Sequence, residues 1–278
     1  MKIAYLILAH KNPFQLLLLI NSLRDGKSHF FIHIDKKSSD DFTFINGNDI
    51  TFCENRYDIK WGGFNMVKAT IGLMNEASNS DFDYFILLSG MDFSIKSKGL
   101  IQQFLKDSKG KSYLSYYHVP TAQWIDNKYR YEKYFFNFKN RFLRSLFNRL
   151  SQKLPYKRKF YNGMQPYIGS QWWILHRDHF KYVLDYLKEN PGLYGFFKYT
   201  FVPDEMVFQS VLLNSVYRND IVNKDPRFLK WTNQSASPLV FTMQNYKEIL
   251  YSDALFARKF DVAIDEEIVH RIKEHISE

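Results

Sequence analysis

The sequence predicts an α/β protein with a mostly parallel central sheet flanked by helices. Short apolar runs at residues 3–9, 30–34 and 84–88 are typical of buried strands. Residues 16–23 and 64–77, which have helical periodicity, lie between these runs. A strand, a helix and a second strand in that order form a βαβ unit, and such units build parallel sheets.

The remaining elements continue this alternation. Further strands are expected at residues 49–53, 113–117, 169–175 and 227–231, and further helices at 100–105, 177–187 and 265–276. The chain has 278 residues, near the upper limit of one hydrophobic core, so one large domain or two closely packed lobes both fit. No repeat, low-complexity tract or linker divides it.

The composition favours a chain without disulfides or a membrane-spanning helix. The sequence has one cysteine, Cys53, so no internal disulfide can form, and this agrees with a cytoplasmic location. Polar residues and Pro13 interrupt the apolar N-terminal segment, which is shorter than the ~20 apolar residues of a spanning helix. Aromatic residues make up 18% of the chain, enough either to line a sugar-binding cleft or to fill a large core.

The positive charge is concentrated in one segment. The formal net charge is +9, but residues 128–159 contain eleven Lys or Arg and one acid, Glu132, so this segment carries +10 and the rest −1. Its apolar residues recur at helical spacing: Phe138, Phe142, Leu143, Leu146, Phe147 and Leu150. Such a basic amphipathic helix either covers the core or contacts an anionic membrane surface. Nucleic-acid binding ranks last because no recognition motif accompanies the charge.

Polar residues follow two of the expected strands at their carboxyl ends, where α/β proteins bind ligands. His10 follows the run at 3–9, and Asp35 follows the run at 30–34. Asp35 can accept hydrogen bonds from a nucleotide base or ribose, or it is simply a turn residue. The pair Gly62-Gly63, just before the helix at 64–77, lets the backbone approach a ligand and can expose N–H groups to an anion.

No metal site is expected. The sequence contains one Asp-x-Asp motif, Asp81-Phe82-Asp83, and it precedes the strand at 84–88, at the amino end of a parallel sheet. At the carboxyl end Asp92 stands as a single acid. His176 and His179 are expected to be polar residues on the surface of a helix, since no third ligand follows at a useful spacing.

The stretch at residues 201–210, FVPDEMVFQS, combines a proline turn with two acids at the start of a helix. Pro203 is expected to hold Val202 in an extended conformation. Two acids in a first helical turn complement the helix dipole, which is one role for them. The other interpretation makes Glu205 a catalytic base at the mouth of a cleft, with Asp204 capping the helix.

Six motifs, in order along almost the whole chain, carry a resemblance to one family: HIDKKS (33–38), WGG (61–63), LLSGMDFSIKS (87–97), GSQWW (169–173), PDE (203–205) and LFARKFD (255–261). With these motifs the chain resembles the core-2/I-branching β-1,6-N-acetylglucosaminyltransferases and their relatives, the peptide O-xylosyltransferases. The resemblance implies a GT-A-type nucleotide-sugar-binding fold, no divalent metal or other cofactor, and inversion at the anomeric carbon.

The resemblance also implies roles for individual residues. Glu205 corresponds to the general base, Arg258 and Lys259 to a basic pair on the donor diphosphate, and Asp35 to a uracil or ribose contact. Trp61 falls in the nucleotide-binding segment, and Gln171 and Trp172 fall beside the transferred sugar. Because Arg258 and Lys259 are adjacent, both can face one diphosphate only at a turn or a helix end. Candidate acceptor contacts are Trp124, Arg130 and Asp92.

On this basis the chain divides into a nucleotide-binding half of about residues 1–118, the basic insertion at about 128–159, and an acceptor-binding and catalytic half at about 160–278. Two departures from the family pattern matter. The xylosyltransferases carry an acid where Gln171 stands, so xylose is not implied. The acetylglucosaminyl branch has an arginine where an ungapped count lands on Ala236, which leaves diphosphate binding to Arg258 and Lys259.

The expected function is transfer of a sugar, N-acetylglucosamine by the resemblance, from a UDP-sugar to a saccharide acceptor of a surface polymer, which can be lipid-linked. The missing anchor and disulfides fit a cytoplasmic bacterial version, with a peripheral position on the inner face of the membrane as an option. The alternatives are transfer of another sugar such as xylose or galactose, and a non-catalytic carbohydrate- or membrane-binding protein on the same scaffold.

Overall fold

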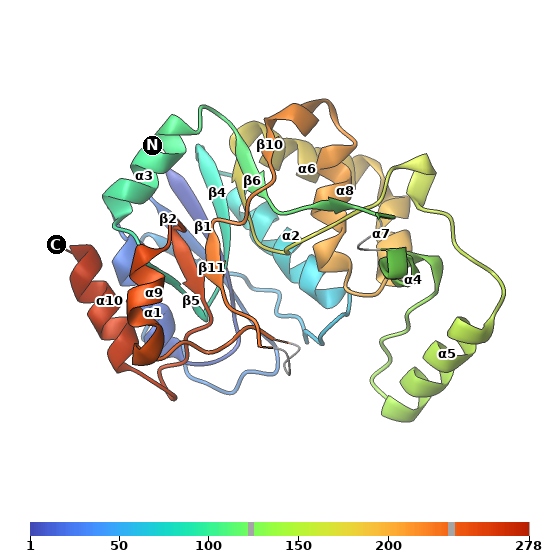
Figure 1. Cartoon of the computed structure of the whole chain (residues 1–278), viewed down its shortest axis with the longest axis horizontal. Coiled ribbons are helices and arrows are strands. Elements are labelled where there is room, and N and C mark those ends of the chain that lie inside the picture. Colours follow the sequence, from blue (N-terminus) through green and yellow to red (C-terminus); the bar gives the residue numbers. More distant parts are fainter. Residues whose placement is uncertain (122–124, 233–236, 278) are drawn as a thin grey trace.

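The computed structural model describes residues 1–121, 125–232 and 237–277. Its centre is a seven-stranded sheet with the strand order β10-β6-β9-β4-β1-β2-β3 (Figure 1). Of these strands only β9 runs antiparallel to its neighbours, so the predicted mostly parallel sheet is confirmed. A smaller sheet, β11-β12-β5, lies beside it, and β7 pairs with β8.

The strands are short; most lie close to predicted positions, but β5, β8, β10 and β12, each of two or three residues, were not predicted. They are β1 (Ile3–Ala9), β2 (His29–Ile34), β3 (Ile50–Phe52), β4 (Tyr84–Ser89), β5 (Asp92–Ser94), β6 (Ser112–Leu114), β7 (Tyr117–His118), β8 (Tyr167–Ile168), β9 (Trp173–His176), β10 (Ile221–Val222), β11 (Arg227–Leu229) and β12 (Phe256–Arg258). The strand expected at 113–117 is divided between β6 and β7, and the one expected at 169–175 starts only at Trp173.

The α-helices are α1 (Pro13–Leu23), α2 (Asn65–Ala77), α3 (Lys98–Asp107), α4 (Tyr129–Glu132), α5 (Arg141–Lys153), α6 (Arg177–Glu189), α7 (Pro191–Lys198), α8 (Val207–Leu213), α9 (Tyr246–Tyr251) and α10 (Glu267–Ser277). The helices α4, α7 and α9 were not predicted; they have four, eight and six residues, too few for a clear periodic pattern. Within the described residues no helix is both long enough and apolar enough to span a bilayer.

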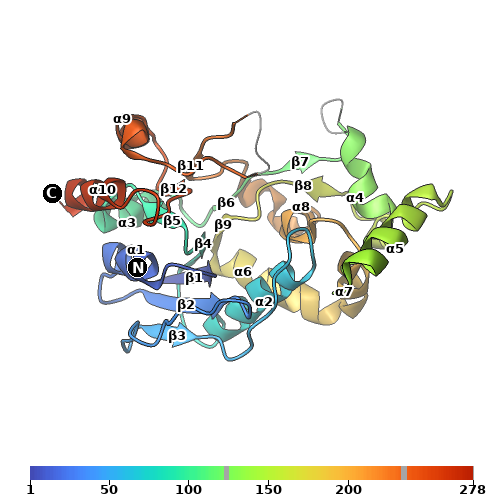
Figure 2. The same ribbon diagram turned by 90° about the horizontal axis from the view of Figure 1, so that it is seen from below.

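Helices cover both faces of the sheet, and the alternation along β1 shows how. Leu6 and Leu8 point to a core that includes α2, α6 and α8, whereas Tyr5 and Ile7 point to a core that includes α1, α3 and α10. In Figures 1 and 2 these two sets of helices lie on opposite sides of the central strands. Every residue of β1 is buried, as expected for a strand covered on both faces.

The basic insertion projects from this body. In both views α5 lies at the margin of the molecule, at the end far from α10. Its apolar side chains are exposed: Phe142 by 72% and Leu150 by 51%. Ser151 is the one buried residue of the helix. The alternative in which this helix covers the core with its apolar face is therefore wrong.

Candidate active site

The carboxyl ends of β1 and β2 meet at one edge of the sheet, as predicted. The Asp35 N–H donates to the Ala9 carbonyl (2.8 Å), which ties the two strand ends together. The Asp35 carboxylate is buried, and its Oδ1 accepts from the Lys37 N–H (2.9 Å). The fold brings Arg258 and Lys259 to the same edge: partial burial and the positive charges of Lys11, Arg258 and Lys259 lower the pKa of His10, while Asp35 opposes them.

Arg258 ends strand β12, and Lys259 follows it. The pair thus sits at a strand end and not at the turn or helix end that the sequence suggested, and the charges of both residues still act on His10. Burial first, and then the neighbouring charges of Arg258 and Lys11, lower the pKa of Lys259. Two cations held close together and partly desolvated favour an anionic ligand, which would relieve their repulsion.

A buried ionic cluster fixes Arg258. Asp92 has no exposed surface; its Oδ1 accepts from Arg258 Nη1 (3.1 Å), and its Oδ2 accepts from Arg227 Nε (3.2 Å) and from the Ser89 N–H (3.0 Å). Because both oxygens are buried and occupied, Asp92 is not available to an acceptor, and the expectation that it contacts one is wrong. Arg227 was missed as a site residue; an arginine inside a strand-like run was its only signal in the sequence.

The two arginines of this cluster pack against the ring of Trp172. The guanidinium of Arg258 lies 4.7 Å from the centroid of the Trp172 ring, and that of Arg227 lies 5.4 Å from it. Both contacts are cation–π interactions. The neighbouring Gln171 has a buried amide nitrogen, Nε2, with no hydrogen-bond partner among the described residues. A buried donor without a partner is costly, so a bound ligand that accepts this hydrogen bond is favoured.

Glu205 contacts the other end of the segment formed by residues 169–172. The Gly169 N–H donates to the Glu205 carbonyl (2.9 Å). Three residues later, the ring of Trp172 packs against the guanidinium of Arg258. Three residues of extended chain span at most about 10 Å, so the turn of Glu205 and the guanidinium of Arg258 contact the two ends of one short segment. Gly169 is required here, because a Cβ would lie 1.8 Å from the Ser115 carbonyl oxygen.

Arg130 pairs with the carboxylate of Glu205. Its Nη1 donates to Glu205 Oε2 at 2.7 Å, and the side chains are 16% and 34% exposed. The structure therefore places the predicted acceptor contact Arg130 directly on the predicted base. The remaining predicted acceptor contact, Trp124, lies outside the described residues, as does Ala236.

Asp204 differs from its expected role. Its carboxylate caps no helix: Oδ1 is buried and has no hydrogen-bond partner among the described residues. Burial, and then the negative charge of Glu205, raise the pKa of Asp204 to about 7, against a smaller opposing effect of Arg130. The expectation that Asp204 caps the helix is therefore wrong.

Val202 adopts φ 50° and ψ 57°, a left-handed conformation, and not the extended one expected before proline. The Val202 N–H donates to the Gly62 carbonyl (3.0 Å), and the Phe201 N–H to the Arg130 carbonyl (2.9 Å). A β-branched residue in this region is strained, and such strain persists only where surrounding contacts impose it. The contacts with Gly62 and Arg130 thus override the local preference and fix the turn that carries Glu205.

The Trp61-Gly62-Gly63 motif is explained mainly by packing. Gly62 has φ 72°, and a Cβ there would meet the Phe201 ring at 2.7 Å. The Gly63 N–H donates to the Lys60 carbonyl (3.0 Å) and is not free for an anion. Trp61 itself is 73% exposed, and its ring lies edge-on to Phe201 at 5.3 Å between centroids. An exposed indole beside the turn of Glu205 is suited to stacking on a sugar or a base.

The Asp-x-Asp motif lies at the amino end of β4, as predicted. Arg177 pairs with Asp81 (2.9 Å) and Asp83 (2.6 Å). Over the described residues no three His, Cys, Asp or Glu side chains are placed to hold a metal ion. His179 is buried, with Nδ1 2.6 Å from Ser112 Oγ, so the expectation of surface polarity is wrong for it.

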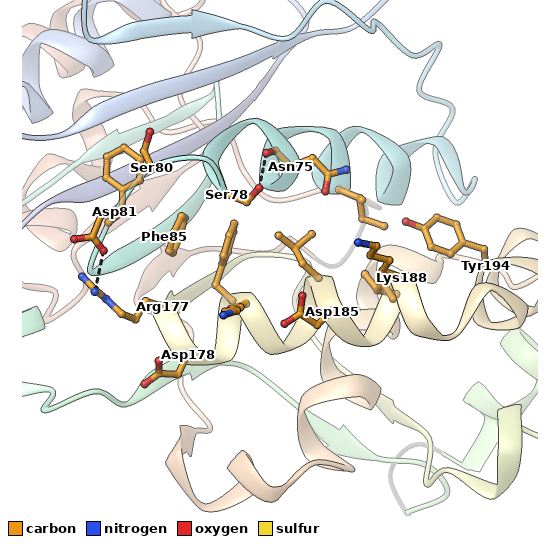
Figure 3. A pocket seen from close by; sticks show the side chains of 16 residues that line it. Asn75, Ser78, Ser80, Asp81, Phe85, Arg177, Asp178, Asp185, Lys188 and Tyr194 are labelled. Carbon is orange, nitrogen blue, oxygen red and sulfur yellow. Dashed lines mark hydrogen bonds and ion pairs between the residues drawn. The ribbon is translucent and has the colours of Figure 1, made fainter.

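A cavity of about 960 Å³ lies between α2 and α6, on the side of Asp81 and Arg177 (Figure 3). Its lining includes Phe85 of β4, Lys188 of α6 and Tyr194 of α7, which are labelled in Figure 3. No predicted donor or acceptor residue lines it. The volume of this cavity thus says nothing about the site at the carboxyl edge, which is defined by its side chains.

The carboxyl edge thus carries the Glu205 carboxylate, the two cations Arg258 and Lys259, and a buried donor, Gln171 Nε2, without a partner among the described residues; these features suit an anionic ligand. The family model of the Core-2/I-Branching enzymes matches residues 3–252, most of the chain, and the chain belongs to this family. The family and the curated relatives are glycosyltransferases.

Those relatives include xylosyltransferase 1 of Mus musculus (22% identical), xylosyltransferase 2 of Homo sapiens (22%) and xylosyltransferase sqv-6 of Caenorhabditis elegans (23%). The alignments cover 99%, 99% and 95% of this chain and 30%, 34% and 35% of the relatives. The chain thus spans about a third of the length of these proteins.

Among solved structures, the galactosyltransferase LgtC with donor and acceptor sugar analogues matches with a TM-score of 0.41 and 11% identity, over 100% of this chain and 97% of the other. Mouse xyloside xylosyltransferase 1 matches with a TM-score of 0.38 and 10% identity, over 92% and 97%.

Proposed function

We propose that this chain is an inverting glycosyltransferase that needs no divalent metal and transfers a sugar from a UDP-sugar to a hydroxyl of a saccharide acceptor. The observation that carries the proposal is the segment from Gly169 to Trp172, which joins the turn of Glu205 to the ring beneath Arg258. This short connection supports a role for Glu205 as the proton acceptor and for Arg258 as the cation on the diphosphate, since a displacement reaction needs both groups at one bound substrate.

The chemistry follows from this placement. The acceptor hydroxyl attacks the anomeric carbon, its proton passes to the Glu205 carboxylate, and the bond from the anomeric carbon to the UDP oxygen breaks with its electron pair. Attack from the face opposite the leaving group inverts the configuration. Arg258 and Lys259 offset the negative charge that grows on the departing diphosphate. Asp92 and Trp172 hold Arg258 in place before the reaction, so little reorganisation is needed.

Around this centre we assign the remaining predicted contacts. Asp35 would bind the base or ribose, Trp61 would stack on the nucleotide, and Gln171 Nε2 would donate to the transferred sugar. Arg130 would position both Glu205 and the acceptor. A neutral amide at residue 171 is the reason to prefer N-acetylglucosamine as the sugar over the xylose named in the relatives. The acceptor would be a lipid-linked saccharide of a surface polymer, on the cytoplasmic side of the membrane.

The first experiment is a thermal-shift screen of UDP-N-acetylglucosamine, UDP-xylose, UDP-galactose and UDP-glucose with EDTA present. A donor at 100 times its Kd should stabilise the fold by about 2.7 kcal/mol. Release of UDP from the best donor is then measured for the wild type and for Glu205→Gln. If neither protein releases UDP with any donor or saccharide acceptor, the alternative of a non-catalytic binding protein is the better account.

A further inference from the structure

The helix α5 exposes a continuous apolar stripe to solvent. Residues spaced by three, four and seven form this stripe on one side of the helix: Phe142, Leu143, Leu146, Phe147 and Leu150. Their exposed fractions run from 39% for Leu146 to 72% for Phe142, and Leu154 just beyond the helix is 55% exposed. Isolated exposed apolar residues are ordinary, but a stripe along a 13-residue helix, roughly 20 Å long, marks an interaction surface.

The opposite face of α5 is already held by the protein. Asn148 makes two hydrogen bonds to the backbone of Phe136: its Oδ1 accepts from the N–H (2.7 Å), and its Nδ2 donates to the carbonyl (3.0 Å). Ser151 is buried on this face, and Phe147, at the margin of the stripe, also packs edge-on against Phe136 and Phe138. The helix is therefore anchored with the stripe outward, and folding back to bury the stripe would break these contacts.

The cations around the stripe are of two kinds. Some are used in the fold: Arg158 stacks on Tyr134 and Phe196, and Lys157 pairs with Glu132 at 3.3 Å. Others form no ion pair with a described residue and are exposed: Lys139, Arg141, Arg149 and Lys153. From residue 133 to 177 the sequence has no acid at all. The surface of α5 thus combines exposed apolar side chains with unneutralised positive charge.

We propose that α5 is a docking surface for an anionic phospholipid bilayer, on which the helix lies flat with its apolar stripe in the acyl boundary and its cations among the headgroups. This combination of chemistry is the one that a charged lipid surface matches. A second copy of the chain would bring two surfaces of like charge together without an acid to pair them. A nucleic acid would match the charge but leave the apolar stripe in water.

The basic insertion, residues 128–159, also links α5 with the carboxyl edge of the sheet, where Glu205 lies. Its first helix, α4, carries Arg130, whose side chain binds Glu205 and whose carbonyl accepts from the Phe201 N–H. Docking through α5 would hold the Glu205 side of the site near the membrane, where a lipid-linked saccharide lies. This consequence rests on the proposed function, whereas the docking itself does not.

The test is co-sedimentation of the whole chain, at several salt concentrations, with two kinds of vesicle. One kind contains phosphatidylglycerol and phosphatidylcholine, and the other contains phosphatidylcholine alone. Binding should require phosphatidylglycerol and weaken as salt rises. The charge variant Arg141→Glu/Arg149→Glu/Lys153→Glu and the apolar variant Phe142→Ser/Leu146→Ser/Leu150→Ser should each lower the partition coefficient at least tenfold. Each side chain is exposed, so circular dichroism and UDP affinity should be unchanged.

The matched control reverses three exposed lysines elsewhere: Lys106→Glu/Lys111→Glu/Lys247→Glu changes the net charge equally and should keep most of the binding. Three binding results would overturn the proposal: no binding to either kind of vesicle, equal binding to both kinds, or an equal loss of binding in the control and the charge variant. Sedimentation of the wild type as a dimer, with the apolar variant sedimenting as a monomer, would also overturn it. Tight binding of DNA or RNA without vesicle binding would also overturn it. None of these readouts needs catalysis, so failure of the proposed reaction leaves this test intact.

Discussion

Replacing Asp204 by Asn should stabilise the protein at neutral and alkaline pH. The Asp204 carboxylate is buried beside Glu205, and its pKa is raised to about 7 from 3.8. The folded state therefore holds this proton up to near pH 7, whereas the unfolded chain releases it near pH 4. The contribution of Asp204 to the unfolding free energy is therefore fully present below about pH 4. It decreases as the pH rises from 4 and is lost once the pH has passed through 7, because the charged form is disfavoured in the fold.

The magnitude follows from the shift. A difference of about 3 pKa units corresponds to roughly 4 kcal/mol of unfolding free energy, lost by the wild type between about pH 4 and pH 8. Asn has nearly the same shape and no charge, so the variant avoids this loss. Its stability relative to the wild type should rise by a few kcal/mol over that range. The sign is opposite to that expected if Asp204 were a helix cap, whose loss would cost about 0.5–2 kcal/mol at neutral pH.

The measurement is urea unfolding of both proteins at pH 5, 6, 7 and 8, followed by circular dichroism. Asp185→Asn, at an exposed carboxylate on α6, is the matched control and should show no comparable trend. The reasoning fails if the free energies of unfolding of Asp204→Asn and the wild type differ by a constant amount across this range. That result would mean that Asp204 is ionised and well solvated in the fold.

Other predictions concern the carboxyl edge. Glu205→Gln should lower turnover by roughly 10²–10⁴ with donor affinity nearly unchanged, because the amide cannot accept the proton; near-full turnover would remove Glu205 as the base. Arg258→Ala and Lys259→Ala should both weaken UDP binding as well as turnover, measured by calorimetry, and unchanged UDP affinity in both would contradict their placement on the diphosphate. Turnover should persist in excess EDTA; activity lost to EDTA and restored by Mn²⁺ would refute metal independence. Gly169→Ala should fail to fold or lose several kcal/mol, since its Cβ would overlap the Ser115 carbonyl.

Much of the fold was accessible from local patterns. The alternation of apolar strands with periodic helices predicted a mostly parallel α/β sheet, because burial on two faces produces continuous apolar runs. The placement of Asp35 and of Asp81 relative to their strands followed directly from strand direction. Short elements such as α9 left too little periodicity to be recognised, and the strand expected at 169–175 was shortened because Gly169 is bonded to Glu205 instead of to a neighbouring strand.

The motifs around Glu205, Arg258 and Lys259 identified candidate side chains, but not what surrounds them. The sequence predicts an acceptor contact at Asp92, and only the fold shows that Arg227, 135 residues away, and Arg258 bind its buried carboxylate. Local rules weigh only near neighbours, and so they predict a helix cap at Asp204 and an extended backbone at Val202. Local sequence determines periodicity and turn preference, whereas the burial and charge of a single polar side chain depend on residues that the chain brings from far away. Those long-range contacts, unlike periodic patterns, leave no regular signal in one sequence.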